Sequence, residues 1–301
     1  MIRVANAPCS YGAFEITVGV LPNVSGPDEI VTSISEAGYE GTELGPPGFL
    51  GTDGELHDRL EGAGLALAGG FIPLRFSEPG HWDEDLGKMA STLDLFADAD
   101  GADARAVLAD DGSPERLANP GRAVSEPSLG LDADGWGRLA EGVARASELA
   151  RKRGFEPAFH PHTGSYVEAP WEIERLLQLT DVGIAFDTGH VSLGGGDALQ
   201  SLRDWRDRIN HVHLKDLRLD ILRGVIADRA DMPEAWRRGV FCELGAGDVD
   251  LDSFVGELLG SGYAGWLVIE QDWVPRPEDD ITIADEAQVR NRRWLADHAG
   301  L

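Results

Sequence analysis

The chain has 301 residues, of which 42% are hydrophobic and 26% charged, an ordinary balance for a soluble globular protein. Its formal net charge of −27 argues against nucleic-acid binding, because an acidic surface repels a phosphate backbone. No apolar run approaches the about 20 residues that a membrane-spanning helix needs, and the N-terminus lacks the pattern of a signal peptide. We therefore expect a cytoplasmic protein that binds neither nucleic acid nor a membrane.

Short apolar runs alternate with longer amphipathic stretches along the chain, which is the pattern of a parallel α/β protein. The expected strands are Ile2–Ala7, Gly41–Leu44, Ala66–Phe71, Ala104–Leu108, Glu156–His160, Val182–Asp187, Ile209–Lys215 and Trp266–Glu270. The expected helices are Asp28–Ala37, Asp53–Ala63, Asp83–Ala97, Asp134–Lys152, Pro170–Gln178, Asp197–Asp207, Leu251–Leu259 and Ile283–Ala296. Eight such units predict a closed (β/α)8 TIM barrel, with a doubly wound open sheet as the alternative.

Two stretches interrupt the alternation, residues 110–131 after the fourth strand and residues 218–249 after the seventh. The first is rich in Gly, Pro, Ser and Asp and predicts a long loop. The second holds one short helical piece, Val225–Arg238, and a glycine-rich segment. Because both follow strands, both would lie over the barrel mouth, where they either cover a pocket or elaborate the surface. We expect residues 1–301 to form one domain.

Side chains that commonly bind metals stand at the C-terminal ends of the expected strands, where barrels place their active sites. They are Glu43, His160, His162, Asp187, His190, His211, His213 and Glu270. A mixed set of nitrogen and oxygen ligands suits Mn²⁺, Co²⁺, Zn²⁺ or Fe²⁺, whereas an all-carboxylate set favours Mg²⁺ or Ca²⁺. The sequence therefore predicts one divalent cation at the barrel mouth.

His211 and His213 lie two residues apart on one strand, so their side chains face the same side. His213 is nearer the end of the strand and should reach the mouth, whereas His211 should be buried one layer below. Lys215 shares this face at the rim, where its ammonium could contact substrate hydroxyls or an enolate. The alternative is that Lys215 is a surface residue paired with Asp216.

Two further pairs leave alternatives open. His160 and His162 share a face if the strand stays extended, so that one can bind the metal while the other stands beside the substrate. Asp187 is followed by a tight turn that can return His190 to the same mouth. Asp187 could equally cap the helix that follows, and the neighbouring His190 favours a site over a cap.

Together these motifs resemble the xylose-isomerase-like TIM barrels and, within that superfamily, the branch of the inosose dehydratases. The resemblance covers nearly the whole chain. It rests on the motifs NAPCSYG, GYEGTELG, HPHTGSYVEAPWEIERLL, IAFDTGHVSLGGGD, INHVHLKD, GVFCELGAGDVDLDSF and GYAGWLVIEQD.

The resemblance implies one divalent metal, Mn²⁺ or Co²⁺ before Zn²⁺ or Fe²⁺, with one ligand from each of strands five to eight. These ligands would be His160, Asp187, His213 and Glu270. It also implies a homo-oligomer, a dimer or tetramer. Many relatives carry Glu where His160 stands, so this site would have one negative charge fewer.

The implied reaction is the dehydration of a polyhydroxylated cyclic ketone such as inosose, through an enolate that the metal stabilises. The candidates for proton transfer are Glu43, His162, His190 and Lys215, and which of them acts as acid or base stays open. The alternative activity is that of a ketose isomerase or 3-epimerase, which enolises a small keto-sugar without expelling water.

Overall fold

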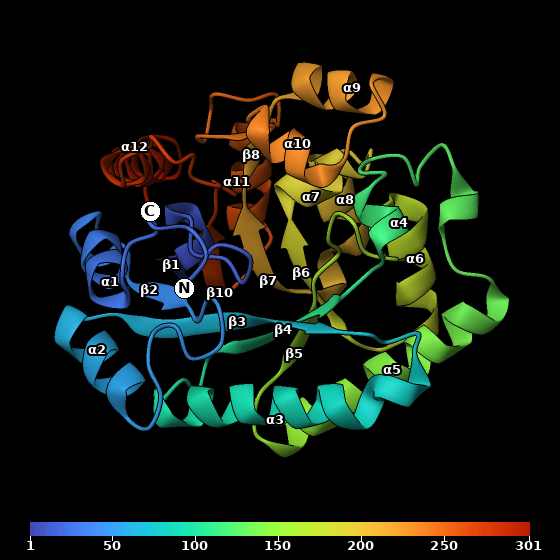
Figure 1. Cartoon of the computed structure of the whole chain (residues 1–301), viewed down its shortest axis with the longest axis horizontal. Helices are drawn as coiled ribbons and strands as arrows, with labels where there is room; N and C mark the ends of the chain where they lie inside the picture. The colour runs from blue at the N-terminus through green and yellow to red at the C-terminus, as the bar shows by residue number, and fades with distance from the viewer.

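In the computed structural model, which describes residues 1–301, eight parallel strands close into a barrel with helices around it (Figure 1). The strands follow one another around the barrel in the order β1, β10, β7, β6, β5, β4, β3 and β2. They are β1 (Ile2–Asn6), β2 (Gly41–Glu43), β3 (Ala66–Leu74), β4 (Arg105–Asp110), β5 (Pro157–Phe159), β6 (Gly183–Asp187), β7 (Ile209–Leu214) and β10 (Gly265–Ile269). The TIM-barrel prediction is confirmed, and the open sheet is excluded.

All eight expected helices are present, and none of their ends is shifted by more than three residues. They are α1 (Pro27–Glu36), α2 (Glu55–Ala63), α3 (Trp82–Asp98), α5 (Ala133–Lys152), α6 (Pro170–Leu179), α8 (Ala198–Trp205), α11 (Leu251–Gly260) and α12 (Thr282–Ala299). Their first turns follow ordinary start signals: Pro27 and Pro170 open α1 and α6, and Asp132 caps α5 by accepting from the backbone N–H of Gly135.

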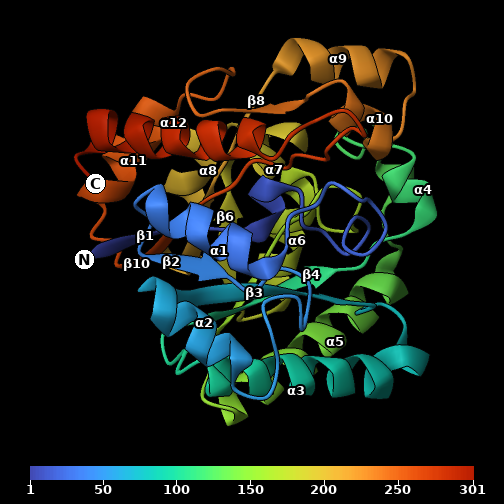
Figure 2. The same ribbon diagram turned by 60° about the vertical axis from the view of Figure 1, so that its left-hand side comes forward.

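The two ends of the chain meet where the barrel closes. Ile2 of β1 pairs with Gly265 of β10, and the N- and C-termini lie near each other in both views of the molecule (Figures 1 and 2). No helix combines the length and the apolar character that a transmembrane span requires.

The two faces of the strands pack differently. Fifty buried apolar residues form one continuous core, which includes Phe159 and Phe186, while Ala158 and Ala185 lie in a separate small cluster with Val107. Because successive side chains on a strand point to opposite faces, the small residues occupy the inside of the barrel. A Cβ at Gly69 would lie only 3.2 Å from Oε1 of Glu43, so small residues also leave the room that this carboxylate needs.

Residues 110–131 contain two short helical turns, α4 (Pro114–Leu117) and η3 (Pro127–Leu129). Arg116 of α4 is buried and donates from Nη1 and Nη2 to both carboxylate oxygens of Glu172 on α6, at 3.0 and 2.9 Å. This bidentate pair fixes the segment against the side of the barrel.

Residues 218–249 fold differently from the sequence prediction. The prediction of a single helical piece over Val225–Arg238 is wrong, because the chain forms two helices, α9 (Leu219–Ala227) and α10 (Met232–Arg237). Arg229 between them has a φ of 51°, and Asp231 then caps α10 by accepting from the N–H of Glu234. Both helices stand beyond the ends of β6 and β7 (Figure 1).

A small antiparallel ladder closes this insertion at its base, where β8 (Asp216–Leu217) pairs with β9 (Phe241–Cys242). The buried carboxylate of Asp216 accepts from the backbone N–H groups of Gly245, Gly247 and Val249. The Asp216 carboxylate therefore binds the backbone of the insertion, and the alternative that it pairs with Lys215 is excluded.

The buried carboxyl of Asp110 at the end of β4 gives the first testable prediction. Its Oδ1 accepts from the backbone N–H groups of Gly112 and Tyr166, at 3.0 Å each. Burial raises the pKa of Asp110 from its usual 3.8 to about 7. Because the folded state holds this proton more tightly than the unfolded state, the stabilisation is complete below about pH 4 and is lost as the pH rises to about 7.

Asp110→Asn keeps the acceptor at Oδ1 but cannot ionise. The free energy of unfolding of the variant, relative to wild type, should therefore increase by about 4 kcal/mol between pH 4 and pH 8. Urea unfolding at a series of pH values measures this difference. A difference that stays constant across the pH series would contradict the prediction.

Candidate active site

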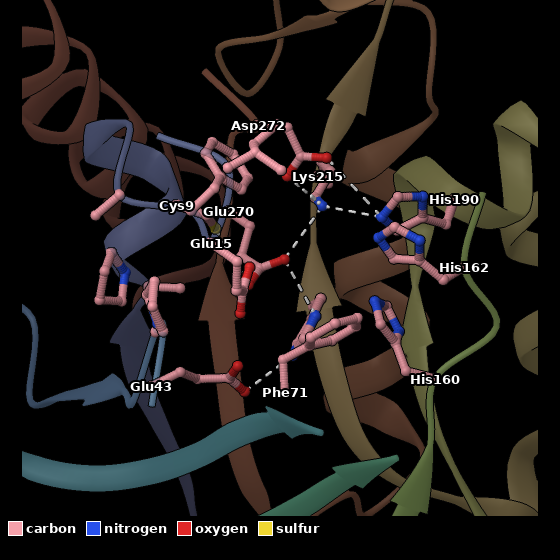
Figure 3. Close-up of a pocket in the computed structure, with 18 of the residues that line it drawn as sticks. Cys9, Glu15, Glu43, Phe71, His160, His162, His190, Lys215, Glu270 and Asp272 are labelled. Carbon is pink, nitrogen blue, oxygen red and sulfur yellow. Dashed lines mark hydrogen bonds and ion pairs between the residues drawn. The ribbon is translucent and has the colours of Figure 1, made fainter. Parts of the chain in front are cut away.

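A cavity of about 190 Å³ opens at the C-terminal ends of the barrel strands, a size that suits a small molecule rather than a polymer. The strand ends and the turns that follow them contribute Glu43, His160, His162, His190, His213, Lys215, Glu270 and Asp272 to its wall (Figure 3). The rim comes from the loop after β1, with Phe14 and Glu15, and from Trp236 of α10. The insertion 218–249 thus covers part of the cavity, whereas residues 110–131 contribute nothing to its lining.

His160 follows β5, and its surroundings determine which ring nitrogen is available. Nδ1 lies 3.3 Å from the carbonyl oxygen of Ala185, and because a carbonyl can only accept, Nδ1 carries the proton. The lone pair of Nε2 is therefore free. Burial holds the pKa of His160 well below its usual value, and the neighbouring His213 lowers it further.

His213 on β7 is oriented through a carboxylate that lies behind it. Oε1 of Glu43 lies 3.0 Å from Nε2 of His213 and 2.8 Å from Nε2 of His211. One oxygen thus accepts from two imidazoles, which leaves Nδ1 of His213 buried and without a hydrogen bond. His211 is fully buried and does not line the cavity, as its place on the strand predicted.

Asp187 has two roles at the end of β6. Oδ1 accepts from the backbone N–H of His190 at 2.8 Å and caps α7 (Thr188–Leu193), a short helix in addition to the eight expected ones. Oδ2 is buried without a hydrogen bond and lies 3.8 Å from Nδ1 of His213. One oxygen of this carboxylate therefore caps the helix, and the other faces His213.

Glu270, which follows β10, turns both carboxylate oxygens toward the cluster. Oε2 lies 3.2 Å from Nδ1 of His213 and 3.2 Å from Nζ of Lys215. Oε1 lies 3.6 Å from Sγ of Cys9. Burial raises the pKa of Glu270, but His213 and Lys215 outweigh that effect and hold it well below its usual value.

The cluster has the donors that a divalent cation requires. Ligand atoms of His160, Asp187 and His213 lie within 4.8 Å of one another, and Glu270 adjoins them. Two of these atoms, Asp187 Oδ2 and His213 Nδ1, are buried polar atoms without a hydrogen bond, which is costly unless another group binds them. A mixed set of two imidazoles and two carboxylates suits a transition-metal dication.

Lys215 is buried at the centre of the site, 2.8 Å from Oδ1 of Asp272 and 3.2 Å from Nε2 of His190 (Figure 3). An ammonium only donates, so Nε2 of His190 accepts and its Nδ1–H donates to Oγ1 of Thr163 at 2.9 Å. Both nitrogens of His190 are therefore engaged within the protein.

His162 lines the cavity and also keeps one ring nitrogen free. Its Nδ1 donates to the carbonyl oxygen of Thr163 at 2.8 Å, so Nε2 keeps its lone pair. Burial lowers the pKa of His162, which keeps the ring neutral near pH 7. Its ring lies 4.1 Å from that of His190, centroid to centroid, on the same wall (Figure 3).

The sequence interpretation missed several residues that line the site, among them Asp272, Phe14, Glu15 and Trp236. Asp272 follows Glu270 by two residues, so the spacing used for the histidine pairs could have pointed to it. Phe14 and Trp236, whose rings lie 6.3 Å apart at the rim, come from segments without a periodic pattern. No local signal predicts their contact.

The contacts of Glu43 give a prediction of stability. Glu43→Gln keeps an oxygen that can accept from both imidazoles, whereas Glu43→Ala leaves two buried N–H groups without acceptors. The alanine variant should lose about 2–5 kcal/mol more unfolding free energy than the glutamine variant. Denaturant unfolding compares the two, and equal losses would show that the bonds to His211 and His213 contribute little.

The chain is similar to known proteins over almost all of its length. Residues 31–298 match the family model described as a xylose isomerase-like TIM barrel. The chain is 32% identical to an inosose dehydratase of Geobacillus kaustophilus, over 87% of this chain and 85% of that one. It is 30% identical to an inosose dehydratase of Erwinia tasmaniensis, over 91% of this chain and 90% of that one.

Among solved structures, the crystal structure of IOLI protein with a binding zinc atom superposes with a TM-score of 0.72. The match covers 99% of this chain and 98% of that one at 13% identity, so the likeness concerns the fold. The family model, the curated relatives and the closed barrel agree. The chain belongs to the xylose isomerase-like TIM barrel family.

Proposed function

We propose that this protein is a metal-dependent hydro-lyase that removes water from a polyhydroxylated cyclic ketone of the inosose type, as in myo-inositol catabolism. The observation that carries the proposal is the similarity to two inosose dehydratases at 30% identity or more over at least 85% of both chains. The chemistry of the cavity supports it, because polar donors and acceptors line a compact chamber at the barrel mouth.

The proposed cation ligands are Nε2 of His160, Oδ2 of Asp187, Nδ1 of His213 and a carboxylate oxygen of Glu270. A divalent cation bound there would act as a Lewis acid on the ketone oxygen and stabilise the negative charge that develops on it. We propose Mn²⁺ or Co²⁺, and the same donors also suit Zn²⁺ or Fe²⁺. Glu43 would orient His213 so that its Nδ1 lone pair points to the cation.

The four candidates for proton transfer divide into two groups. Glu43 and His190 already use their polar atoms on other side chains, so we propose that they position His213 and Lys215. His162 has a free Nε2 and can accept the proton from the carbon next to the ketone. Lys215 carries hydrogens on Nζ that can bond to the β-hydroxyl as it leaves as water.

Elimination would give an enol that tautomerises to a 1,2-diketone with the loss of one water molecule. The alternative, a ketose isomerase or 3-epimerase, begins with the same proton abstraction but keeps the mass of the substrate. The two inosose dehydratases favour elimination. Incubating the metal-loaded protein with inosose and measuring product mass and diketone absorbance separates the two. A product of unchanged mass would overturn the lyase proposal.

The ligand set predicts that Asp187→Asn greatly lowers cation affinity while the protein stays folded, because the amide still caps α7 but has lost its charge. Anomalous diffraction of crystals grown with Mn²⁺ or Co²⁺ should show one peak, about 2.0–2.3 Å from the four proposed ligands. Asp197→Asn is the matched control, since Asp197 caps α8 in the same way on the surface. A peak surrounded by other residues, or equal affinity in the two variants, would exclude this ligand set.

The proton-transfer assignment predicts that His162→Ala and Lys215→Met each lower kcat by about 10²-fold or more. Each variant should still bind one equivalent of metal, because neither residue is a proposed ligand. Steady-state kinetics with metal analysis tests this, and His81→Ala at the surface serves as the control. A variant with full activity would show that its residue takes no part in proton transfer, and loss of metal would make that residue a ligand.

A further inference from the structure

The ammonium of Lys215 lies within ion-pair distance of three carboxylates. Nζ is 2.8 Å from Oδ1 of Asp272, 3.2 Å from Oε2 of Glu270 and 3.3 Å from Oδ2 of Asp187. Glu270 and Asp187 are proposed ligands of the cation, whereas Asp272 is not. The same two carboxylates therefore attract both the lysine and the metal.

Lys215 and a bound cation would therefore compete for the carboxylates of Asp187 and Glu270. Two positive charges a few ångströms apart repel each other strongly where little water screens them, and the Lys215 side chain is only 2% exposed. A lysine side chain is long and flexible, so Nζ can approach Asp187 and Glu270 more closely if nothing holds it elsewhere. Such a shift would block the cation and remove the ammonium from the substrate.

We propose that Asp272 is a positioning residue, which anchors the Lys215 ammonium beside the cation and so keeps Asp187 and Glu270 available as ligands. This inference rests on the ligand set of the proposed function. Of the three carboxylate contacts of Nζ, the one with Asp272 is the shortest and is a well-directed hydrogen bond. The Asp272 side chain is 6% exposed, so water screens this contact little.

His190 supports the same position of Lys215 without a charge. Its Nε2 accepts from Nζ at 3.2 Å, and Thr163 fixes the ring through Nδ1. Figure 3 shows Asp272 on the side of Lys215 that faces away from Glu43 and His160, with His190 beside the ammonium. Asp272 therefore draws the ammonium away from the proposed cation position. Asp272 should dominate, because a hydrogen bond between two charged groups is stronger than one to a neutral ring.

The test is to measure the affinity of metal-stripped protein for Mn²⁺ and Co²⁺ by isothermal titration calorimetry. Asp272→Asn should lower cation affinity about tenfold or more, because the released lysine competes for Asp187 and Glu270. Lys215→Met should bind the cation at least as tightly as wild type, since a competing charge is gone. The double variant should return to within about threefold of Lys215→Met.

Glu15→Gln is the matched control. Glu15 is another acidic residue on the cavity wall, and no ion pair joins it to Lys215. The Glu15→Gln variant measures the general effect of losing one negative charge at the cavity. It should lower cation affinity less than about threefold, because solvent screens an exposed charge. Thermal unfolding of each variant verifies that it is folded.

Three results would overturn the inference. They are unchanged affinity in Asp272→Asn, a double variant as weak as Asp272→Asn, and weaker binding in Lys215→Met. The last does not depend on how well the Asp272 variant folds. If wild-type protein binds neither cation, the ligand set and this inference fail together, whereas an unaffected Asp272→Asn overturns the inference alone.

Discussion

The negative charge gathered at the mouth of the barrel is the constraint on which the rest of the site depends. Three carboxylates, those of Asp187, Glu270 and Asp272, surround the ammonium of Lys215, and a fourth, that of Glu43, lies behind His213. Carboxylates in a buried place are costly unless donors or cations compensate them. Two imidazole N–H groups donate to the carboxylate of Glu43, and the ammonium of Lys215 donates to that of Asp272. The negative charges of Asp187 and Glu270 are compensated only in part. A divalent cation would complete the balance.

The fold affords this arrangement because the inside and the outside of the barrel are built from different residues. Large apolar side chains such as Phe159 and Phe186 pack outward against the helices, while Ala158, Ala185 and Gly69 leave the interior open for the carboxylate of Glu43. Parallel strands then place successive chain segments side by side at one end. The ligand candidates are thus held on rigid elements, which is what precise coordination needs.

Much of this could be predicted from the sequence, because the relevant signals are local. Strand ends and the two-residue period are sufficient to bring His160, Asp187, His213 and Glu270 to one mouth and to bury His211 below it. The break between α9 and α10 could not be predicted, since it depends on Arg229 adopting a positive φ in a segment with a helical pattern. The two-residue spacing from Glu270 could have pointed to Asp272 as a residue of the site, but not to its contact with Lys215, because the chain must turn after β10 before Asp272 reaches that lysine.

The tautomers of the histidines mark the limit of what residue types reveal. His160, His162 and His190 look equivalent in the sequence, yet the two that contact carbonyl oxygens keep a free Nε2, whereas His190 uses both nitrogens on Thr163 and Lys215. A partner atom that can only accept or only donate decides which nitrogen remains available. Chemistry at this mouth is therefore set as much by the neighbours of each imidazole as by its position.

The charge of the proposed ligand set depends on His160, which contributes a neutral imidazole rather than a carboxylate. Two carboxylates and two neutral imidazoles would balance the charge of a dication, whereas a third carboxylate in the ligand set would leave an excess of negative charge on it. A cation with two carboxylate ligands withdraws more electron density from a bound substrate oxygen than a cation with three.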